Sequence, residues 1–225
     1  MPWSDWIRTV EVEPSLYGAD FSRLGGQIEE LLRAECKIFH FDVGDGHFVE
    51  PITMGPIVLQ SISPLIHDYG GVIDVHLMVD DPAKHFRAIA EAGGDSVTFH
   101  YEAVSDVGAT VRAAREQELQ VGLAFSPETA PEAVAMAAHD VDIVLCMSIH
   151  PGYSGQKFMD EAYGRIERVR ELLPGHIKVQ VDGGVGEENI NKLWHAGASL
   201  FVAASSIFKY EDLPRAYRRL VHAIA

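Results

Sequence analysis

The stretch KIFHFDVGDGH, residues 37–47, sets the pattern on which the chain is built. Aromatic and aliphatic side chains alternate with His40 and Asp42, and a turn containing Gly44 and Gly46 follows. A short, largely apolar run that ends in a glycine turn is typical of a buried strand in a parallel sheet. His40 and Asp42 are two residues apart, so their side chains project from the same face of this strand.

Seven further runs of this kind occur, and longer amphipathic stretches separate them. The expected strands are 9–15, 37–43, 72–77, 96–100, 120–125, 142–147, 177–181 and 200–203. The expected helices are 21–34, 56–66, 83–92, 107–118, 131–138, 162–173, 187–195 and 213–224. Eight strand–helix units without a Pro/Ser-rich linker favour a closed barrel over an open, doubly wound sheet. The sequence therefore predicts an α/β fold, a single (β/α)8 TIM barrel over residues 1–225, with residues 1–8 as a short N-terminal extension.

Composition narrows the class of protein. The chain has 225 residues, 47% of them hydrophobic, which is enough for one well-filled core. A net charge of −15 argues against a nucleic-acid partner and requires that any anionic ligand be held by local backbone N–H groups. Cys36 and Cys146 form no CxxC pair and are expected to be buried free thiols. We see no apolar leader or membrane-spanning stretch, so we expect a cytoplasmic protein with no membrane partner.

Polar side chains stand at the ends of three expected strands: His40 and Asp42, then His76, then Asp182. The carboxyl ends of the strands carry the chemistry of a TIM barrel. Each of these residues alone is more often a structural histidine or a turn-capping carboxylate. Two imidazoles and two carboxylates on one rim, however, form a donor set suited to Zn2+, Fe2+, Mn2+ or Co2+. We therefore expect a site for one divalent metal ion.

Glycine-rich turns follow the last three expected strands, at 151–156, 182–186 and 203–206. Glycine lets backbone N–H groups approach an anion, and Ser205 can add a hydroxyl donor. Loops after the seventh and eighth strands, with a short helix N-terminus, usually hold phosphate in this fold. These turns predict a phosphate site at the barrel mouth.

Six ordered motifs, from Pro14 nearly to the C-terminus, resemble the ribulose-phosphate 3-epimerase family. They are Pro14-Ser15-Leu16 with Ala19-Asp20-Phe21, His40-x-Asp42 with Asp45-Gly46-His47-Phe48-Val49, Asp74-Val75-His76-Leu77-Met78, Met147-Ser148 with Pro151-Gly152 and Gly155-Gln156-Lys157-Phe158, Val181-Asp182-Gly183-Gly184, and Ser205 with Ile207-Phe208.

The resemblance implies a metal-dependent isomerase of carbohydrate metabolism in the pentose phosphate route. It would invert C3 of a phosphorylated ketose, interconverting D-ribulose 5-phosphate and D-xylulose 5-phosphate through a metal-stabilised enediolate. Asp42 and Asp182 would be the catalytic acid and base, because two carboxylates can remove a proton from one face and deliver one to the other.

The same resemblance implies that His40, Asp42, His76 and Asp182 bind the metal. The substrate contacts that it implies are Ser15, His76, Met78, Met147, Gly152, Ser154, Gly155, Gly183, Gly184, Ala204 and Ser205. Met78 and Met147 would cover the reacting carbons, although either methionine by itself is as readily a core residue.

The chain departs from the family pattern at a few positions. The family usually has methionine at Gly44 and proline followed by asparagine at 50–51, which are Glu50 and Pro51 here. Tyr17-Gly18 stands where a small or aliphatic residue and then a small polar one are common, and Ala204 replaces a glycine. Apart from Ala204, these positions lie on the first two strand–helix loops. They indicate either a substrate altered at the end remote from phosphate or neutral drift in loops.

Other functions compete with this epimerase. The altered loops leave open allulose 6-phosphate or a four-carbon ketose phosphate as the substrate. A lyase or decarboxylase on the same barrel is disfavoured, because Asp-x-Lys-x-x-Asp and strand-end lysines are missing. A non-catalytic phosphate-binding barrel is disfavoured by the complete set of four metal-type side chains. The family resemblance also implies a homo-oligomer.

Overall fold

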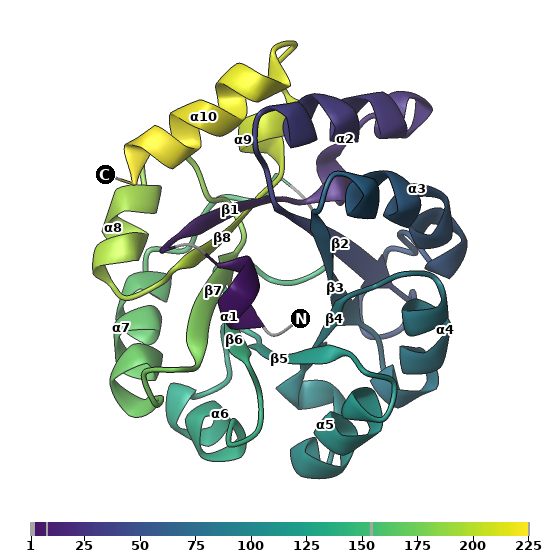
Figure 1. The fold of residues 1–225 in the computed structure, drawn as a ribbon. Coiled ribbons are helices and arrows are strands. Elements are labelled where there is room, and N and C mark those ends of the chain that lie inside the picture. Colours follow the sequence, from purple (N-terminus) through teal and green to yellow (C-terminus); the bar gives the residue numbers. More distant parts are fainter. Residues whose placement is uncertain (1–2, 8, 154, 225) are drawn as a thin grey trace.

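A computed structural model describes residues 3–7, 9–153 and 155–224. Eight parallel strands surround a central axis, and helices cover the outside of the sheet (Figure 1). The strands are β1 (Glu11–Pro14), β2 (Ile38–Gly44), β3 (Val72–Met78), β4 (Ser96–His100), β5 (Gln120–Phe125), β6 (Ile143–Met147), β7 (Lys178–Asp182) and β8 (Leu200–Ala203). The helices are α1 (Trp3–Trp6), α2 (Leu24–Arg33), α3 (Pro56–Asp68), α4 (Phe86–Glu91), α5 (Val107–Arg115), α6 (Pro131–Ala137), α7 (Ala162–Leu172), α8 (Ile190–His195), α9 (Ser205–Phe208) and α10 (Leu213–Ala223).

The strands pair in the order β1-β8-β7-β6-β5-β4-β3-β2, all in parallel. A parallel bridge between Ser15 and His40 joins the two ends of this order and closes the ring. The predicted (β/α)8 barrel is therefore confirmed. Closure brings the carboxyl ends of all eight strands to one mouth.

The register between β2 and β3 determines what faces the barrel interior. His40 pairs with Asp74 and Asp42 pairs with His76. Residues paired in this way lie side by side on the same face of a parallel sheet. All four are at most 4% exposed, so two layers of polar groups occupy the interior below the mouth.

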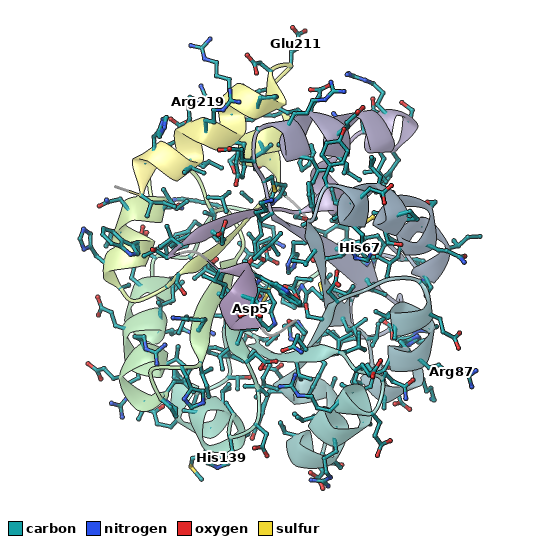
Figure 2. The ribbon with its side chains drawn as sticks, viewed as in Figure 1. Asp5, His67, Arg87, His139, Glu211 and Arg219 are labelled. Carbon is teal, nitrogen blue, oxygen red and sulfur yellow. The ribbon has the colours of Figure 1, made fainter. Side chains whose placement is uncertain are left out.

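The main apolar core lies between the sheet and the outer helices. Phe39 and Phe41, which alternate with the polar residues of β2, belong to this core and are fully buried. Helix α10 buries Leu213, Tyr217 and Leu220, spaced three or four residues apart as an amphipathic helix requires. Charged side chains such as Arg87 and Glu211, by contrast, project from the outer surface of the barrel (Figure 2).

Helix α1 lies across the amino-terminal end of the barrel, near its axis (Figure 1). Trp3, Trp6 and Ile7 are buried there in a separate apolar cluster. Its other members are the first residues of four strands, Ile38, Val72, Ile143 and Leu200. The predicted N-terminal extension thus contains a helix that sequence periodicity missed, because one turn is too short to show a period.

Several predicted boundaries are wrong for local reasons. The expected strand 9–15 is only Glu11–Pro14, and the expected helices 21–34 and 83–92 each begin as a 3-10 turn, at Phe21–Arg23 and Pro82–Lys84. The expected helix 107–118 ends at Arg115, because the chain turns through Glu118 with a left-handed φ of 62°. The expected helix 187–195 begins only at Ile190. The strands predicted at 96–100, 120–125 and 200–203 have the predicted bounds, and the remaining ends differ by at most two residues, as helix and strand ends commonly do.

Two further expectations concern the whole chain. Cys36 and Cys146 are buried and unpaired, as predicted. Among the residues that the structure describes, no helix has both the length and the apolar character needed to cross a bilayer.

We predict that Trp3→Ala destabilises the fold without impairing the site at the opposite mouth. Trp3 is 3% exposed and packs against Trp6 with ring centroids 4.9 Å apart, so truncation should lower the free energy of unfolding by about 3 kcal/mol. Denaturant unfolding measures this loss. Trp194→Ala, which removes a tryptophan that is 38% exposed, is the matched control and should cost less. Equal losses would show that α1 contributes no more than an exposed side chain.

Candidate active site

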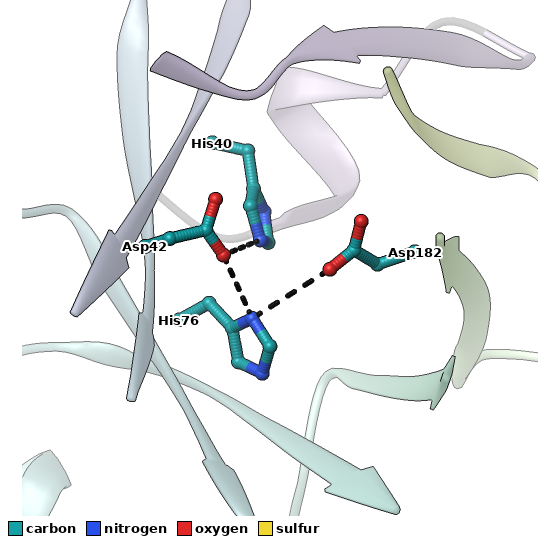
Figure 3. A group of neighbouring side chains, drawn as sticks. All are labelled: His40, Asp42, His76 and Asp182. Atoms are coloured by element: carbon teal, nitrogen blue, oxygen red, sulfur yellow. Dashed lines mark hydrogen bonds and ion pairs between the residues drawn. The ribbon is translucent and has the colours of Figure 1, made fainter. Parts of the chain in front are cut away.

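The four predicted metal ligands meet at the carboxyl ends of β2, β3 and β7 (Figure 3). His76 Nδ1 lies 3.0 Å from Asp42 Oδ1 and 3.9 Å from Asp182 Oδ2, and His40 Nε2 lies 3.3 Å from Asp42 Oδ1. One ligand atom from each of the four residues falls within 4.8 Å of all the others. This spacing is compatible with a single divalent ion.

The two carboxylates of this group differ in their affinity for a proton. Burial would raise the pKa of Asp42, but His40 and His76 outweigh it and hold that pKa well below its usual range. Burial and the neighbouring charge of Asp42 raise the pKa of Asp182 to about 7. Two like charges at this distance oppose joint ionisation, so the metal-free site favours one ionised and one protonated carboxyl group.

His40 is oriented for a ligand that belongs in the centre of the group. Its Nδ1 lies 3.1 Å from Asp74 Oδ2, whereas its buried Nε2 makes no hydrogen bond among the described residues and has only the charge contact with Asp42 Oδ1 at 3.3 Å. A buried ring nitrogen that makes no hydrogen bond is unfavourable unless something binds it. A divalent ion would fill this role, and the two imidazoles and two carboxylates form a donor set that such an ion accepts.

A chain of hydrogen bonds runs outward from His76. Its Nε2 lies 2.9 Å from Nε2 of His100, the last residue of β4, and His100 Nδ1 lies 3.3 Å from Glu102 Oε2. Burial lowers the pKa of His100 to about 4. Burial alone would raise the pKa of Glu102, but hydrogen bonds from His100, Thr129 and Ser126 lower it to about 2.

His100 and Glu102 were missed by sequence reasoning. They are two residues apart at the end of β4, the same spacing as His40 and Asp42 at the end of β2. This repeated spacing was the signal that could have identified them.

A second acidic group lies one layer deeper, where Glu13, His40 and Asp74 come together. Burial raises the pKa of Glu13 to about 7. The Gln180 amide Nε2 donates hydrogen bonds to both Glu13 and Asp74. These hydrogen bonds make the layer a support under His40, although Glu13 Oε1 and Gln180 Oε1 are buried without a hydrogen-bond partner among the described residues.

A cavity opens above Asp42 and Asp182 at the barrel mouth. The predicted substrate contacts that line it are Ser15, Met78, Met147, Gly152, Gly155, Gly183, Gly184, Ala204 and Ser205. His76 lies beneath them in the group of metal-type ligands, and Ser154 lies outside the described residues. Tyr17, Tyr153, Ile149, Val185 and Val202, which were not predicted as contacts, complete the lining.

Glycine is required at the turn after β7. Gly183 and Gly184 have φ values of 121° and 63°, and a Cβ at either would lie 2.9 Å from the backbone nitrogen of Ile149 or Phe158. The Ser148 hydroxyl donates to the carbonyl oxygens of Asp182 and Gly183 at 2.8 and 2.7 Å, which fixes the turn from the neighbouring strand. The turn therefore presents bare backbone to the cavity.

Two of the departures from the family pattern, Gly18 and Ala204, lie close to each other. A Cβ on Gly18 would lie 3.1 Å from the Cβ of Ala204, tighter than an ordinary contact. The Cα and carbonyl carbon of Ala204 would both lie 3.3 Å from the same Cβ, so the methyl group and the backbone of Ala204 together disfavour a side chain at position 18. The structure gives no reason for alanine at position 204.

The departures on the second loop are also linked. A Cβ on Gly44 would lie 2.8 Å from the carbonyl oxygen of Pro51, so the loop conformation excludes methionine at position 44. The Tyr153 hydroxyl donates to Glu50 Oε2 at 2.9 Å, which joins this loop to the one after β6. The altered residues thus form local contacts at the cavity edge.

The fold and site together define a TIM barrel with a candidate metal-binding active site at its carboxyl-terminal mouth. Residues 11–208 match the ribulose-phosphate 3 epimerase family. The chain is 34% identical over 211 residues to ribulose-phosphate 3-epimerase of Bacillus subtilis (strain 168), covering 92% of this chain and 96% of the relative. It is 37% identical over 206 residues to the Escherichia coli (strain K12) enzyme of the same name, covering 89% and 90%. The chain therefore belongs to the ribulose-phosphate 3-epimerase family and is an isomerase acting on carbohydrates.

Solved structures share the fold at lower sequence identity. A 3-hexulose-6-phosphate synthase superposes with a TM-score of 0.73 at 18% identity, covering 96% of this chain and 100% of that one. Orotidine 5'-phosphate decarboxylase from Pyrococcus horikoshii OT3 superposes with a TM-score of 0.70 at 16% identity, covering 95% and 98%. These likenesses support the barrel alone.

We predict that divalent metal binding strengthens as pH rises from about 5.5 to 8. The raised pKa values of Asp182 and His40 mean that both groups hold protons in the metal-free protein at low pH, and the ion must displace them. Competition with a chelator of known affinity measures the effect. Asp182→Asn has one less proton to displace, so its affinity should depend less steeply on pH. A wild-type affinity that does not change with pH contradicts the prediction.

Proposed function

We propose that this chain inverts C3 of a phosphorylated ketose, interconverting D-ribulose 5-phosphate and D-xylulose 5-phosphate with one divalent metal ion. One observation carries the proposal: Asp42 and Asp182, from strands separated by β1 and β8, face one cavity with their pKa values displaced in opposite directions. Such a displacement suits a pair in which one group accepts a proton and the other delivers one.

The four-residue group supports the metal requirement. His40 and His76 would supply neutral nitrogen ligands, and Asp42 and Asp182 would supply carboxylate oxygens. A bound ion would polarise the substrate carbonyl and stabilise the negative charge that develops when the adjacent C–H bond breaks. The donor set accepts Zn2+, Fe2+, Mn2+ or Co2+.

Asp42 and Asp182 would exchange the protons at C3. The ionised carboxylate removes the hydrogen from one face of the carbon, and the protonated carboxyl group delivers a hydrogen to the other face. The Ser15 hydroxyl donates to Asp42 Oδ2 at 2.6 Å and keeps this carboxylate in place beside the cavity. For the reverse reaction, the two groups exchange roles.

The remaining lining of the cavity supports a phosphorylated substrate. No lysine or arginine lines this cavity within the described ranges, so the phosphate would be held by backbone N–H groups at Gly155, Gly183 and Gly184 and by the Ser205 hydroxyl. Met78 and Met147 are 3% and 1% exposed and line the same cavity, where they would keep water from the reacting carbon.

A different ketose phosphate is a second candidate substrate. Tyr17 and Tyr153 line the cavity, and Tyr153 is bonded to Glu50 at its edge. These side chains would contact the sugar of a bound substrate. Allulose 6-phosphate, which is longer by one carbon than a pentulose phosphate, and four-carbon ketose phosphates would test these contacts directly.

We predict that Asp182→Asn strongly slows inversion but spares one half of the proton exchange. In deuterated water, Asp42 should still remove the C3 hydrogen from one epimer, so deuterium enters that epimer alone while kcat for epimerisation falls about 10²–10⁴-fold. Both quantities are measured by NMR of each recovered epimer. The protein used is first shown by metal analysis to contain the bound divalent ion. Asp140→Asn, an exposed carboxylate elsewhere on the surface, should behave as wild type. Near-normal inversion by a metal-loaded Asp182→Asn protein would rule out the two-carboxylate mechanism.

We predict that ribulose 5-phosphate gives the highest kcat/KM among ketose phosphates. The panel contains ribulose 5-phosphate, allulose 6-phosphate and a four-carbon ketose phosphate, each assayed for epimerisation with saturating metal. Tyr153→Phe keeps the ring and removes the hydroxyl bonded to Glu50, so any shift in relative kcat/KM reports on the contact between these two loops at the cavity edge. A clear preference for another member of the panel assigns the chain to that substrate instead.

A further inference from the structure

We infer, on the basis of the proposed metal site, that Glu102 is a positioning residue that holds His76 in its metal-binding tautomer through His100. Glu102 lies on the turn after β4, outside the group of four ligands. The connection is the chain of contacts from His76 Nε2 to His100 Nε2 and from His100 Nδ1 to Glu102 Oε2.

The outer end of this chain is fixed. The backbone N–H of Ser126 donates to Glu102 Oε1 at 2.8 Å, and the Thr129 hydroxyl donates to the same oxygen. Oε2 is therefore directed at His100. An ionised carboxylate can only accept hydrogen bonds, so the hydrogen between Glu102 and His100 must be on His100 Nδ1.

The position of this hydrogen determines the next one. A neutral imidazole with its hydrogen on Nδ1 has a lone pair on Nε2, so His100 accepts at Nε2. The facing His76 Nε2, 2.9 Å away, must then carry the hydrogen. His76 Nδ1 is left with the lone pair, and this is the atom that lies nearest Asp42 and Asp182. Glu102 therefore favours the form of His76 that can bind an ion at Nδ1.

Asp42 opposes this arrangement when no ion is bound. Its Oδ1 lies 3.0 Å from His76 Nδ1 and would attract a hydrogen to that atom. A hydrogen on Nδ1 blocks metal binding, so the two carboxylates at the two ends of the chain compete. His40 needs no such relay, because Asp74 contacts its Nδ1 directly at 3.1 Å.

Glu102→Gln should reverse the whole chain while keeping its shape. Ser126 N–H can only donate, so the amide oxygen of the new side chain must stay on that side and its NH2 group must face His100. His100 Nδ1 then has to accept, its hydrogen moves to Nε2, and His76 is driven to carry its hydrogen on Nδ1. The affinity for metal should fall about 10–100-fold, as for other substitutions that disturb the partners of metal-bound histidines.

Zn2+ affinity, measured by chelator competition, compares the wild type with three variants. Glu102→Asp retains an acceptor-only carboxylate and should lose less affinity than Glu102→Gln. Glu128→Gln makes the same change of charge on an exposed carboxylate in the loop after β5, where Glu128 pairs with His150, and should match wild type. If Glu128→Gln weakens Zn2+ binding as much as Glu102→Gln does, the effect comes from net charge alone and the inference is overturned.

The hydrogens themselves can be located by nitrogen-15 NMR of the histidine rings in the Zn2+-loaded wild-type protein. We expect the hydrogen of His100 on Nδ1 and that of His76 on Nε2. A hydrogen on His100 Nε2 overturns the relay even if no variant folds. Failure of the wild type to bind Zn2+ or any other divalent ion would instead contradict the proposed metal site, so the two failures are distinguishable.

Discussion

The pairing of β2 with β3 is the constraint on which the site depends. It sets His40 beside Asp74 and Asp42 beside His76, so each imidazole has a carboxylate on the adjoining strand. A slip of one residue would turn one strand's polar side chains towards the helices and bring Phe39 and Phe41 into the barrel interior. The apolar core outside the sheet and the polar layers inside it therefore enforce the same register. The alternation of polar and apolar residues in β2 therefore determines both the strand register and the position of the site residues.

The polar interior is costly unless its groups satisfy one another. Glu13, Asp74 and Gln180 are fully buried, and Gln180 donates to both carboxyl groups, although Glu13 Oε1 and Gln180 Oε1 have no hydrogen-bond partner among the described residues. Asp74 also accepts hydrogen bonds from Ser96 and Thr98 at 2.7 and 3.2 Å. Such a network resists rearrangement, because breaking one contact leaves a buried group unpaired. The rigid layer beneath His40 accounts for the fixed orientation of a ring whose other nitrogen faces the site.

The sequence was sufficient to predict the eight strand–helix units and the convergence of His40, Asp42, His76 and Asp182, because both follow from short-range alternation and from barrel geometry. Helix α1 could not be predicted in this way, since its packing depends on strand ends from distant parts of the chain. The contact of Gly18 with Ala204 likewise joins the first and last strand–helix loops, and no local pattern shows it. His100 and Glu102 are two residues apart, as His40 and Asp42 are. Their contacts with His76 and Ser126, however, can be seen only in the folded structure.

The close approach of Gly18 to Ala204 couples the first and last strand–helix loops. A side chain introduced at position 18 would meet the Ala204 methyl group at 3.1 Å and the Ala204 Cα at 3.3 Å, so residue 204 would have to move by a few tenths of an ångström. Ala204 and the neighbouring Ser205 line the cavity. A loop transplanted from a relative with a side chain at position 18 would therefore disturb the cavity wall on the far side of the β1–β8 seam as well as its own side.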